Sequence, residues 1–133
     1  MNPHYPAVAK RADNRCEYCR APEQVFNFSF EVEHILPRSL GGDSSPENTA
    51  LACESCNLHK SDATEAWDEI EGHAASLFDP RRDQWHEHFH FDVETGVLVG
   101  LTSVGRGSIT RLSMNSTFQV RARRHWVRLN LYP

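Results

Sequence analysis

The stretch that decides the fold runs from residue 16 to residue 60. It begins with Cys16-Glu17-Tyr18-Cys19 and ends in Cys53-Glu54-Ser55-Cys56, followed by Asn57-Leu58-His59-Lys60. Between the two cysteine pairs lie Glu33-His34-Ile35-Leu36-Pro37, then Gly41-Gly42 and Asn48. A metal ion shared by the two pairs would close the intervening chain around a carboxylate, an imidazole and an amide.

The four cysteines indicate a structural zinc site. Two Cys-x-x-Cys pairs have the spacing of thiolate ligands on Zn²⁺. The alternative is two disulfides, which would require an oxidising compartment. The start Met1-Asn2-Pro3-His4 lacks the basic and then apolar pattern of an export signal. No apolar run approaches the roughly 20 residues that span a bilayer. We therefore expect a soluble cytoplasmic protein with no membrane partner.

Size and pattern predict one α+β domain over residues 1–133. We expect a short helix over 8–14, a strand over 25–32 where apolar and polar residues alternate, and a loop over 37–48 rich in Pro, Gly, Ser and Asp. A second strand over 49–52 and a helix over 54–61 follow. This gives a core of about residues 15–61, and residues 62–78 are expected to be a linker.

The remainder, about residues 77–133, forms a C-terminal extension. Alternation over 84–92, a turn at 94–96 and a strand over 97–101 predict a β-hairpin. Two helices are expected after it, over 102–113 and from 115 or 116 to 129. On the first strand His86, His88 and His90 would share one face. Because side chains two residues apart on a strand are about 6.5 to 7 Å apart, a third histidine would not reach a shared metal. We expect a solvated or substrate-facing edge.

The core segment resembles the HNH endonuclease family. The shared elements are a Cys-x-x-Cys pair, an acidic residue followed by His-Ile-x-Pro, a Gly-Gly loop, a central Asn, and Cys-x-x-Cys-Asn-x-x-Lys, and they cover about Arg15 to Ser61. The tail from Leu77 to Arg106 also looks like the extension of small free-standing bacterial members. The resemblance implies a zinc-stapled ββα-metal finger with a C-terminal hairpin and two helices.

The resemblance also implies a catalytic site. His34 would be the general base that takes a proton from water. Glu33 and Asn57 would hold one catalytic ion, and their oxygen donors suit Mg²⁺ or Mn²⁺ rather than a second Zn²⁺. The alternative for His34 is a buried histidine satisfied by a backbone carbonyl, and for Glu33 a surface ion pair with Lys60 or Arg38. Since neighbouring strand residues point to opposite faces, the strand must twist or end at His34.

Further residues have candidate supporting roles. Asn48 would pin the loop and hold His34 in one tautomer, or else only finish a turn. Lys60 would contact a phosphate, or be a solvated lysine on the helix face. The remaining candidates for substrate binding are His59, which is also a substitute ligand, and Arg38, Arg81 and Arg82. The tryptophans Trp67, Trp85 and Trp126 are expected in the core.

The charge distribution bears on a polyanionic partner. The net charge is −4, although counterion release by Lys and Arg supplies most non-specific affinity for nucleic acid. Residues 95–133 carry six arginines and no acid, a net +6, whereas residues 1–94 carry a net −10. A polarised protein can bind DNA through one face. Alternatively, the arginines only solvate a terminal helix.

These observations predict a metal-dependent DNA endonuclease, with structural Zn²⁺ at Cys16, Cys19, Cys53 and Cys56 and catalytic Mg²⁺ or Mn²⁺. One alternative is a non-catalytic zinc module that binds nucleic acid or protein on the same scaffold. Another is a nuclease of RNA or of the toxin type. The sequence indicates no recognition helix for a defined DNA site.

Overall fold

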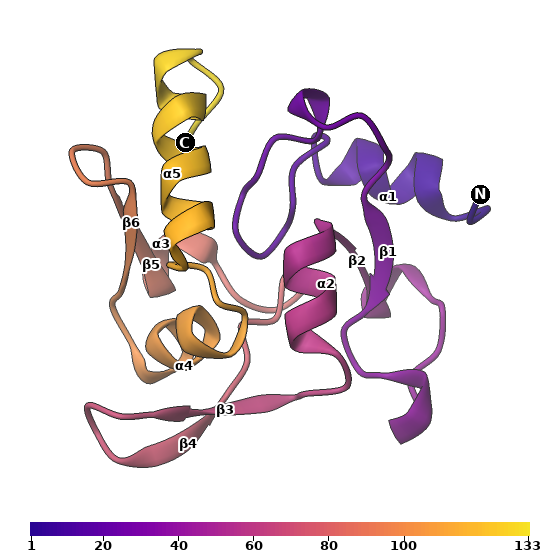
Figure 1. The fold of residues 1–133 in the computed structure, drawn as a ribbon. Helices are drawn as coiled ribbons and strands as arrows, with labels where there is room; N and C mark the ends of the chain where they lie inside the picture. The colour runs from indigo at the N-terminus through magenta and orange to yellow at the C-terminus, as the bar shows by residue number, and fades with distance from the viewer.

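A computed structural model describes residues 1–133 and has a mixed α and β architecture (Figure 1). Its strands form three separate two-stranded antiparallel sheets. The elements in chain order are α1 (Tyr5–Arg11), η1 (Glu23–Val25), β1 (Glu31–His34), η2 (Arg38–Leu40), η3 (Pro46–Asn48), β2 (Thr49–Ala52), α2 (Glu54–Lys60), β3 (Glu65–Asp68), β4 (His73–Ser76), α3 (Trp85–His88), β5 (Phe89–Asp92), β6 (Val97–Gly100), α4 (Ser103–Arg111) and α5 (Thr117–Arg128).

The first sheet brings the two ends of the long loop together. β1 pairs with β2 so that Glu33 lies opposite Ala50 and His34 opposite Thr49. α2 follows β2 directly, and Cys53 is its N-cap, since its sulfur accepts from the backbone N–H of Cys56 at 3.4 Å. The strands and helix expected in this segment are therefore present, and the loop between the strands begins immediately after His34.

The prediction of a strand over 25–32 is wrong for residues 25–30. Only Glu31 and Val32 of that range are in β1, and a 3-10 helix lies over Glu23–Val25. The reason is the carboxylate of Glu23, which accepts from the backbone N–H of Phe30 at 2.7 Å and from the Asn14 amide at 2.7 Å. These bonds close residues 23–30 into a compact loop, which alternation of apolar residues does not predict.

The expected linker over 62–78 is also wrong, because a β-hairpin forms there. β3 and β4 pair from Glu65 with Ser76 to Asp68 with His73, and Gly72 takes a positive φ of 73° in the turn. Figure 1 shows this hairpin projecting at the bottom of the molecule. Trp67 on it is 57% exposed and so is not a core residue, unlike Trp85 and Trp126.

The alternating run over 84–92 divides into a helical turn and a strand. α3 holds His86 and His88, whereas His90 lies in β5. The anchor is Trp85, whose indole N–H donates to the carbonyl of Tyr18 at 2.8 Å. The common histidine face that we expected therefore does not exist. β5 and β6 do pair as a hairpin, and α4 and α5 follow it.

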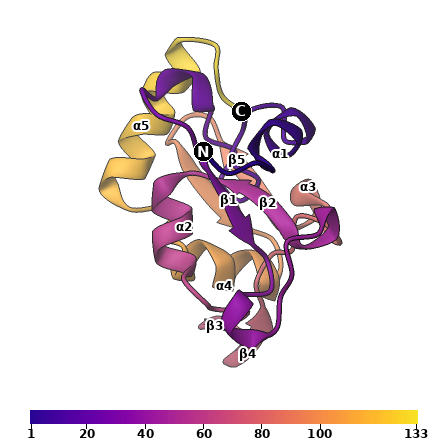
Figure 2. The same cartoon turned by 90° about the vertical axis from the view of Figure 1, so that its right-hand side faces the viewer.

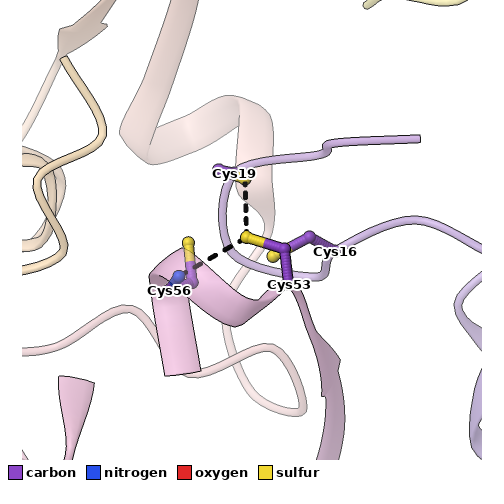
Figure 3. Close-up of side chains that lie close together, drawn as sticks. All are labelled: Cys16, Cys19, Cys53 and Cys56. Atoms are coloured by element: carbon purple, nitrogen blue, oxygen red, sulfur yellow. Dashed lines mark hydrogen bonds between the residues drawn. The ribbon is translucent and has the colours of Figure 1, made fainter. Parts of the chain in front are cut away.

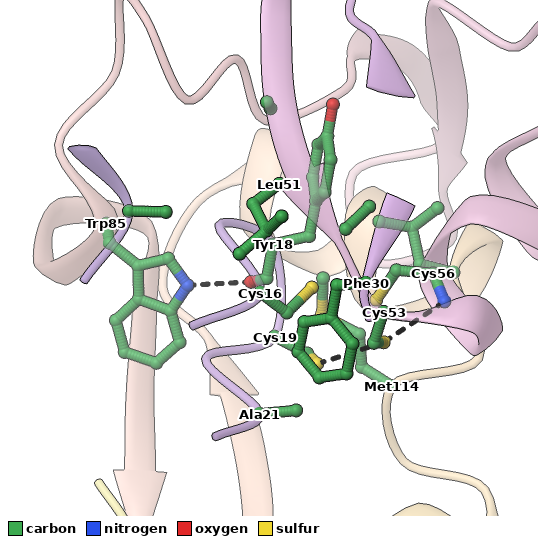
Figure 4. Packing of buried hydrophobic residues seen from close by; sticks show 14 of the residues in the cluster. Cys16, Tyr18, Cys19, Ala21, Phe30, Leu51, Cys53, Cys56, Trp85 and Met114 are labelled. Carbon is green, nitrogen blue, oxygen red and sulfur yellow. Dashed lines mark hydrogen bonds between the residues drawn. The ribbon is translucent and has the colours of Figure 1, made fainter. Parts of the chain in front are cut away.

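The C-terminal extension packs against the segment with the cysteines. One cluster of 21 buried residues contains all four cysteines together with Trp85, Met114 and Trp126. Figure 4 shows the cysteines with Trp85 and Met114. At the end of the chain the hydroxyl of Tyr132 donates to the carbonyl of Cys19 at 2.8 Å. The first cysteine pair is therefore covered by residues more than 60 positions away in the sequence.

We expect Asp68→Asn to destabilise the protein at neutral pH. Asp68 is fully buried and accepts two hydrogen bonds from Arg106, at 3.0 and 2.8 Å, and one from Ser103 at 2.6 Å. These bonds, Arg106 first, lower the pKa of Asp68 well below its usual 3.8. The carboxylate therefore contributes stability above about pH 4 and loses it as pH falls further.

The measurement is urea unfolding of the wild type and Asp68→Asn from pH 7 to pH 2. The difference in unfolding free energy should be constant from pH 7 to about pH 4 and should shrink below that. Asp92→Asn is the control, because its carboxylate accepts only from the backbone of its own turn. A difference that does not depend on pH would contradict the role of the charged form.

Candidate active site and zinc centre

The four cysteines converge into one buried cluster (Figure 3). Their exposed fractions lie between 0 and 3%, and their sulfur atoms all lie within 4.8 Å of one another. The sulfurs of Cys19 and Cys53 are 3.7 Å apart. Tetrahedral Zn²⁺ with Zn–S bonds of about 2.3 Å requires sulfurs about 3.8 Å apart. All four thiols are free, so the cluster has the spacing of a zinc site and not that of disulfides.

The pKa values of these four thiols depend strongly on one another. Burial works against a thiolate at Cys16, but hydrogen bonds from the other three cysteines outweigh it and lower the pKa of Cys16 well below 9.0. The neighbouring Cys16 in turn raises the pKa of Cys53 and Cys56 well above 9.0. Four thiolates so close together require a metal ion.

His34 ends β1 at the edge of the loop. Its Nε2 lies 2.9 Å from the hydroxyl oxygen of Ser44. Partial burial, followed by the positive charge of Arg38, lowers the pKa of His34 from its usual 6.5. The imidazole is therefore neutral at pH 7, which is the form that can accept a proton. Ser44 gave no signal in the sequence beyond its place in a polar loop.

Asn48 ties the two ends of this loop together. Its amide oxygen accepts from the backbone N–H of Leu36 at 2.8 Å, and its amide nitrogen donates to the carbonyls of Leu36 at 3.0 Å and Asp43 at 2.8 Å. It forms no bond to the ring of His34, so the expectation that Asn48 sets the tautomer of His34 is corrected: Ser44 holds that ring. Gly42 is required here, because a Cβ would lie 1.7 Å from the Leu36 carbonyl oxygen.

Glu33 faces the interior, away from His34. It is 5% exposed, and its two oxygens lie 2.5 Å from the ammonium of Lys60 and 2.6 Å from the hydroxyl of Tyr18. Burial raises the pKa of Glu33, and Lys60 and Tyr18 oppose that rise. The ion pair with Lys60 that the sequence left open is therefore present, and it is buried.

Lys60 does not have the position that we expected. It is 2% exposed and also donates to the carbonyls of His34 at 3.1 Å and Ile35 at 3.0 Å. A buried ammonium with three acceptors cannot contact a phosphate at the surface, so this prediction is corrected. Lys60 instead fastens the end of α2 to the end of β1, where His34 lies.

Tyr18 is the residue of this group that sequence reasoning missed. It lies between Cys16 and Cys19 and is fully buried. Its hydroxyl donates to Glu33, while its carbonyl accepts from Trp85. The available signal was a large aromatic residue inside a cysteine knuckle, where its ring has to pack against the adjoining strands (Figure 4).

The other candidate residues are dispersed. Asn57 is half-buried, and its side chain forms no hydrogen bond. His59 is exposed on α2 and bonds the carbonyl of Ser55 at 2.7 Å. Arg38 and Arg82 are exposed. Arg81 is ion-paired with Glu17 and is 18% exposed, so the prediction that Arg81 clamps DNA is corrected.

A cavity of about 710 Å³ lies between the loop after β1 and residues 76–83. Its lining includes two cationic side chains, Lys60 and Arg82, and four carboxylates, Asp43, Glu47, Asp79 and Asp83. His34 does not line this cavity. An excess of carboxylates repels a phosphate backbone. The cavity is therefore not the groove in which a polyanion would meet His34.

The model of the HNH endonuclease family matches residues 16–63. The match begins at the first cysteine and contains both cysteine pairs, His34, Asn48 and Asn57. Residues 16–63 are therefore similar to the HNH endonuclease family. No curated protein and no solved structure matches the chain. No helix of the protein combines the length and apolarity needed to cross a membrane.

We expect Cys53→Ser to lose the zinc and to unfold. A serine hydroxyl is a poor replacement for a thiolate, and zinc binding contributes directly to folding in small structural sites. Metal analysis of the purified protein should give about one zinc per wild-type chain and much less for the variant. Ser55→Ala, in the same knuckle but with no sulfur, is the control. A variant that kept stoichiometric zinc would contradict a four-cysteine site.

The buried ion pair predicts strongly non-additive substitutions. Lys60→Met should cost about 3 to 5 kcal/mol, because it leaves the Glu33 carboxylate buried and unpaired. Adding Glu33→Gln should recover much of that loss, since the remaining amide carries no charge. Urea unfolding of the two single variants and the double variant provides the measurement. Additive losses would show that the two side chains do not interact.

Proposed function

We propose that the chain is a metal-dependent endonuclease that hydrolyses phosphodiester bonds in DNA. The observation that carries the proposal is His34, a neutral imidazole held by Ser44 at the end of β1, within a segment that matches the HNH endonuclease family. β1, β2 and α2, with the cysteine cluster at their base, support the more specific reading of a ββα-metal finger.

His34 acts as the general base in this proposal. With the Ser44 oxygen accepting the hydrogen on Nε2, the lone pair on Nδ1 takes the proton from the attacking water. Asn48 keeps the loop, and hence Ser44, in place through its bonds to Leu36 and Asp43. Lys60 holds the backbone carbonyl of His34. The ring is thus oriented from the loop side and its backbone from the helix side.

Glu33 and Asn57 would hold the catalytic ion. Glu33 is 5% exposed and uses one oxygen for Lys60 and the other for Tyr18, so an ion bound there would have to replace the Lys60 ammonium or the Tyr18 hydroxyl. The Asn57 amide forms no hydrogen bond that a ligand would have to displace. These oxygen donors suit Mg²⁺ or Mn²⁺. When bound, such an ion polarises the phosphoryl group and stabilises the leaving oxygen.

We expect His34→Ala to lower cleavage of supercoiled plasmid by about 10² to 10⁴-fold, the usual contribution of a general base. Zinc content and unfolding free energy should stay near the wild-type values, because the ring is only partly buried. Reactions with Mg²⁺, with Mn²⁺ and without added divalent ion define the metal dependence. His90→Ala is the matched control, since His90 is an exposed histidine of the C-terminal hairpin.

Three outcomes would contradict the proposal. Unfolding of His34→Ala would make the histidine structural. Binding of DNA without cleavage under any metal condition would favour a non-catalytic zinc module. Cleavage of RNA, with the plasmid DNA left intact, would indicate a ribonuclease.

A further inference from the structure

The six arginines of residues 95–133 are not equivalent in the structure. Three of them are used internally. Arg106 pairs with Asp68, Arg111 donates to the carbonyl of Lys60 at 3.3 Å, and Arg123 is fully buried. Arg123 donates to the carbonyls of Gly96 at 2.8 Å and Met114 at 2.6 Å. Arg106 and Arg123 are therefore engaged within the protein, whereas Arg111 is exposed and makes only this one long hydrogen bond.

The other three arginines, Arg121, Arg124 and Arg128, lie on α5 and are exposed. None of them forms a salt bridge or a side-chain hydrogen bond. Arg121 lies over the ring of Phe118, 5.0 Å from its centroid. His125 is exposed between them. α5 thus presents three unpaired positive charges to solvent, in a protein whose net charge is −4.

The spacing places these charges in one row, which we call the α5 basic face. At about 100° per residue, Arg121, Arg124 and Arg128 fall within an arc of about 60°. At about 1.5 Å per residue they extend over about 10.5 Å along the helix. The phosphates of one DNA strand advance about 3.4 Å each along the duplex axis, so the row has the length of about three phosphate-to-phosphate steps.

The inner face of α5 is occupied by the protein. Arg123 and Trp126 are buried, and Trp126 belongs to the main hydrophobic cluster. A helix that binds a membrane surface needs its broad apolar face free, and this condition is not met. Seen from the side, α5 and α2, the helix that carries Asn57, both lie in the left half of the molecule (Figure 2).

We propose that the α5 basic face binds the phosphate backbone of double-stranded DNA without reading its sequence. The proposal deepens the proposed function, since it takes the polyanion to be the nuclease substrate. Charge complementarity carries it: three unpaired guanidinium groups, one of them stacked on an exposed ring, face solvent in a row with no carboxylate paired to them. Guanidinium groups contact phosphate oxygens well, because their donors form a planar fork.

The test uses the full-length protein and a fluorescently labelled 25-base-pair duplex, with anisotropy measured over a series of NaCl concentrations and no added divalent ion. We compare the wild type with the triple variant Arg121→Gln, Arg124→Gln and Arg128→Gln. The slope of log affinity against log salt should become less steep by about 2.7, which is 0.9 for each of three phosphates. At 0.1 M salt the affinity should fall by up to about 500-fold.

Two controls separate charge from structure. The triple Arg→Lys variant keeps the three charges and should keep most of the slope. Lys10→Gln removes an exposed charge on α1 and should leave the slope unchanged. Zinc content and unfolding free energy should be the same in all variants, because no substituted side chain is part of the core.

An unchanged slope in the triple Arg→Gln variant would overturn the proposal, as would an equal loss in Lys10→Gln. Tighter binding of the wild type to single-stranded RNA, or to vesicles of anionic lipid, than to the duplex would also overturn it. Failure of the nuclease function is a separate result. In that case the plasmid would stay intact with every metal, while the slope for the duplex would still depend on Arg121, Arg124 and Arg128.

Discussion

The four sulfurs of the cysteine cluster are the constraint on which the rest of the structure depends. They join the knuckle after α1 to the start of α2, and β1, β2 and the loop between them are thereby held as one unit. Four buried thiols within 4.8 Å of one another cannot all ionise unless a cation is present. Zinc would therefore supply both the charge balance and the crosslink that a 133-residue chain with short strands needs.

A second buried interaction connects this cluster to the proposed active site. Tyr18 belongs to the first cysteine knuckle and donates to Glu33, which pairs with Lys60, which in turn holds the carbonyl of His34. Each step is a hydrogen bond or ion pair of 2.5 to 3.1 Å. The position of the histidine backbone thus depends on the same knuckle that would bind zinc, so loss of zinc should disturb the site even where the loop itself remains folded.

The proposed catalytic groups and the exposed positive charges lie in different parts of the chain. The segment that matches the HNH family holds the imidazole and the oxygen donors but is acidic overall, and the large cavity beside its loop is lined by carboxylates. The C-terminal extension covers the cysteine knuckle through Trp85 and Tyr132 and contributes the exposed arginines of α5. In the proposed nuclease, attraction of the polyanion and hydrolysis of its backbone are therefore assigned to separate elements.

The sequence by itself determined the elements whose signals are local. The Cys-x-x-Cys spacing predicted a metal cluster, and the acidic-His-Ile-x-Pro element indicated the segment that matches the HNH family. Thr102 marked the start of α4, and the start of α5 was placed at Asn115 or Ser116, of which Ser116 is the N-cap. Only the tertiary structure decided which polar side chains were buried together. Lys60 looked like a surface lysine because its partners, Glu33 and the carbonyls after it, are about 25 residues away in the chain. Pairings across such distances leave no periodic trace, since they arise when β1 and α2 pack against each other.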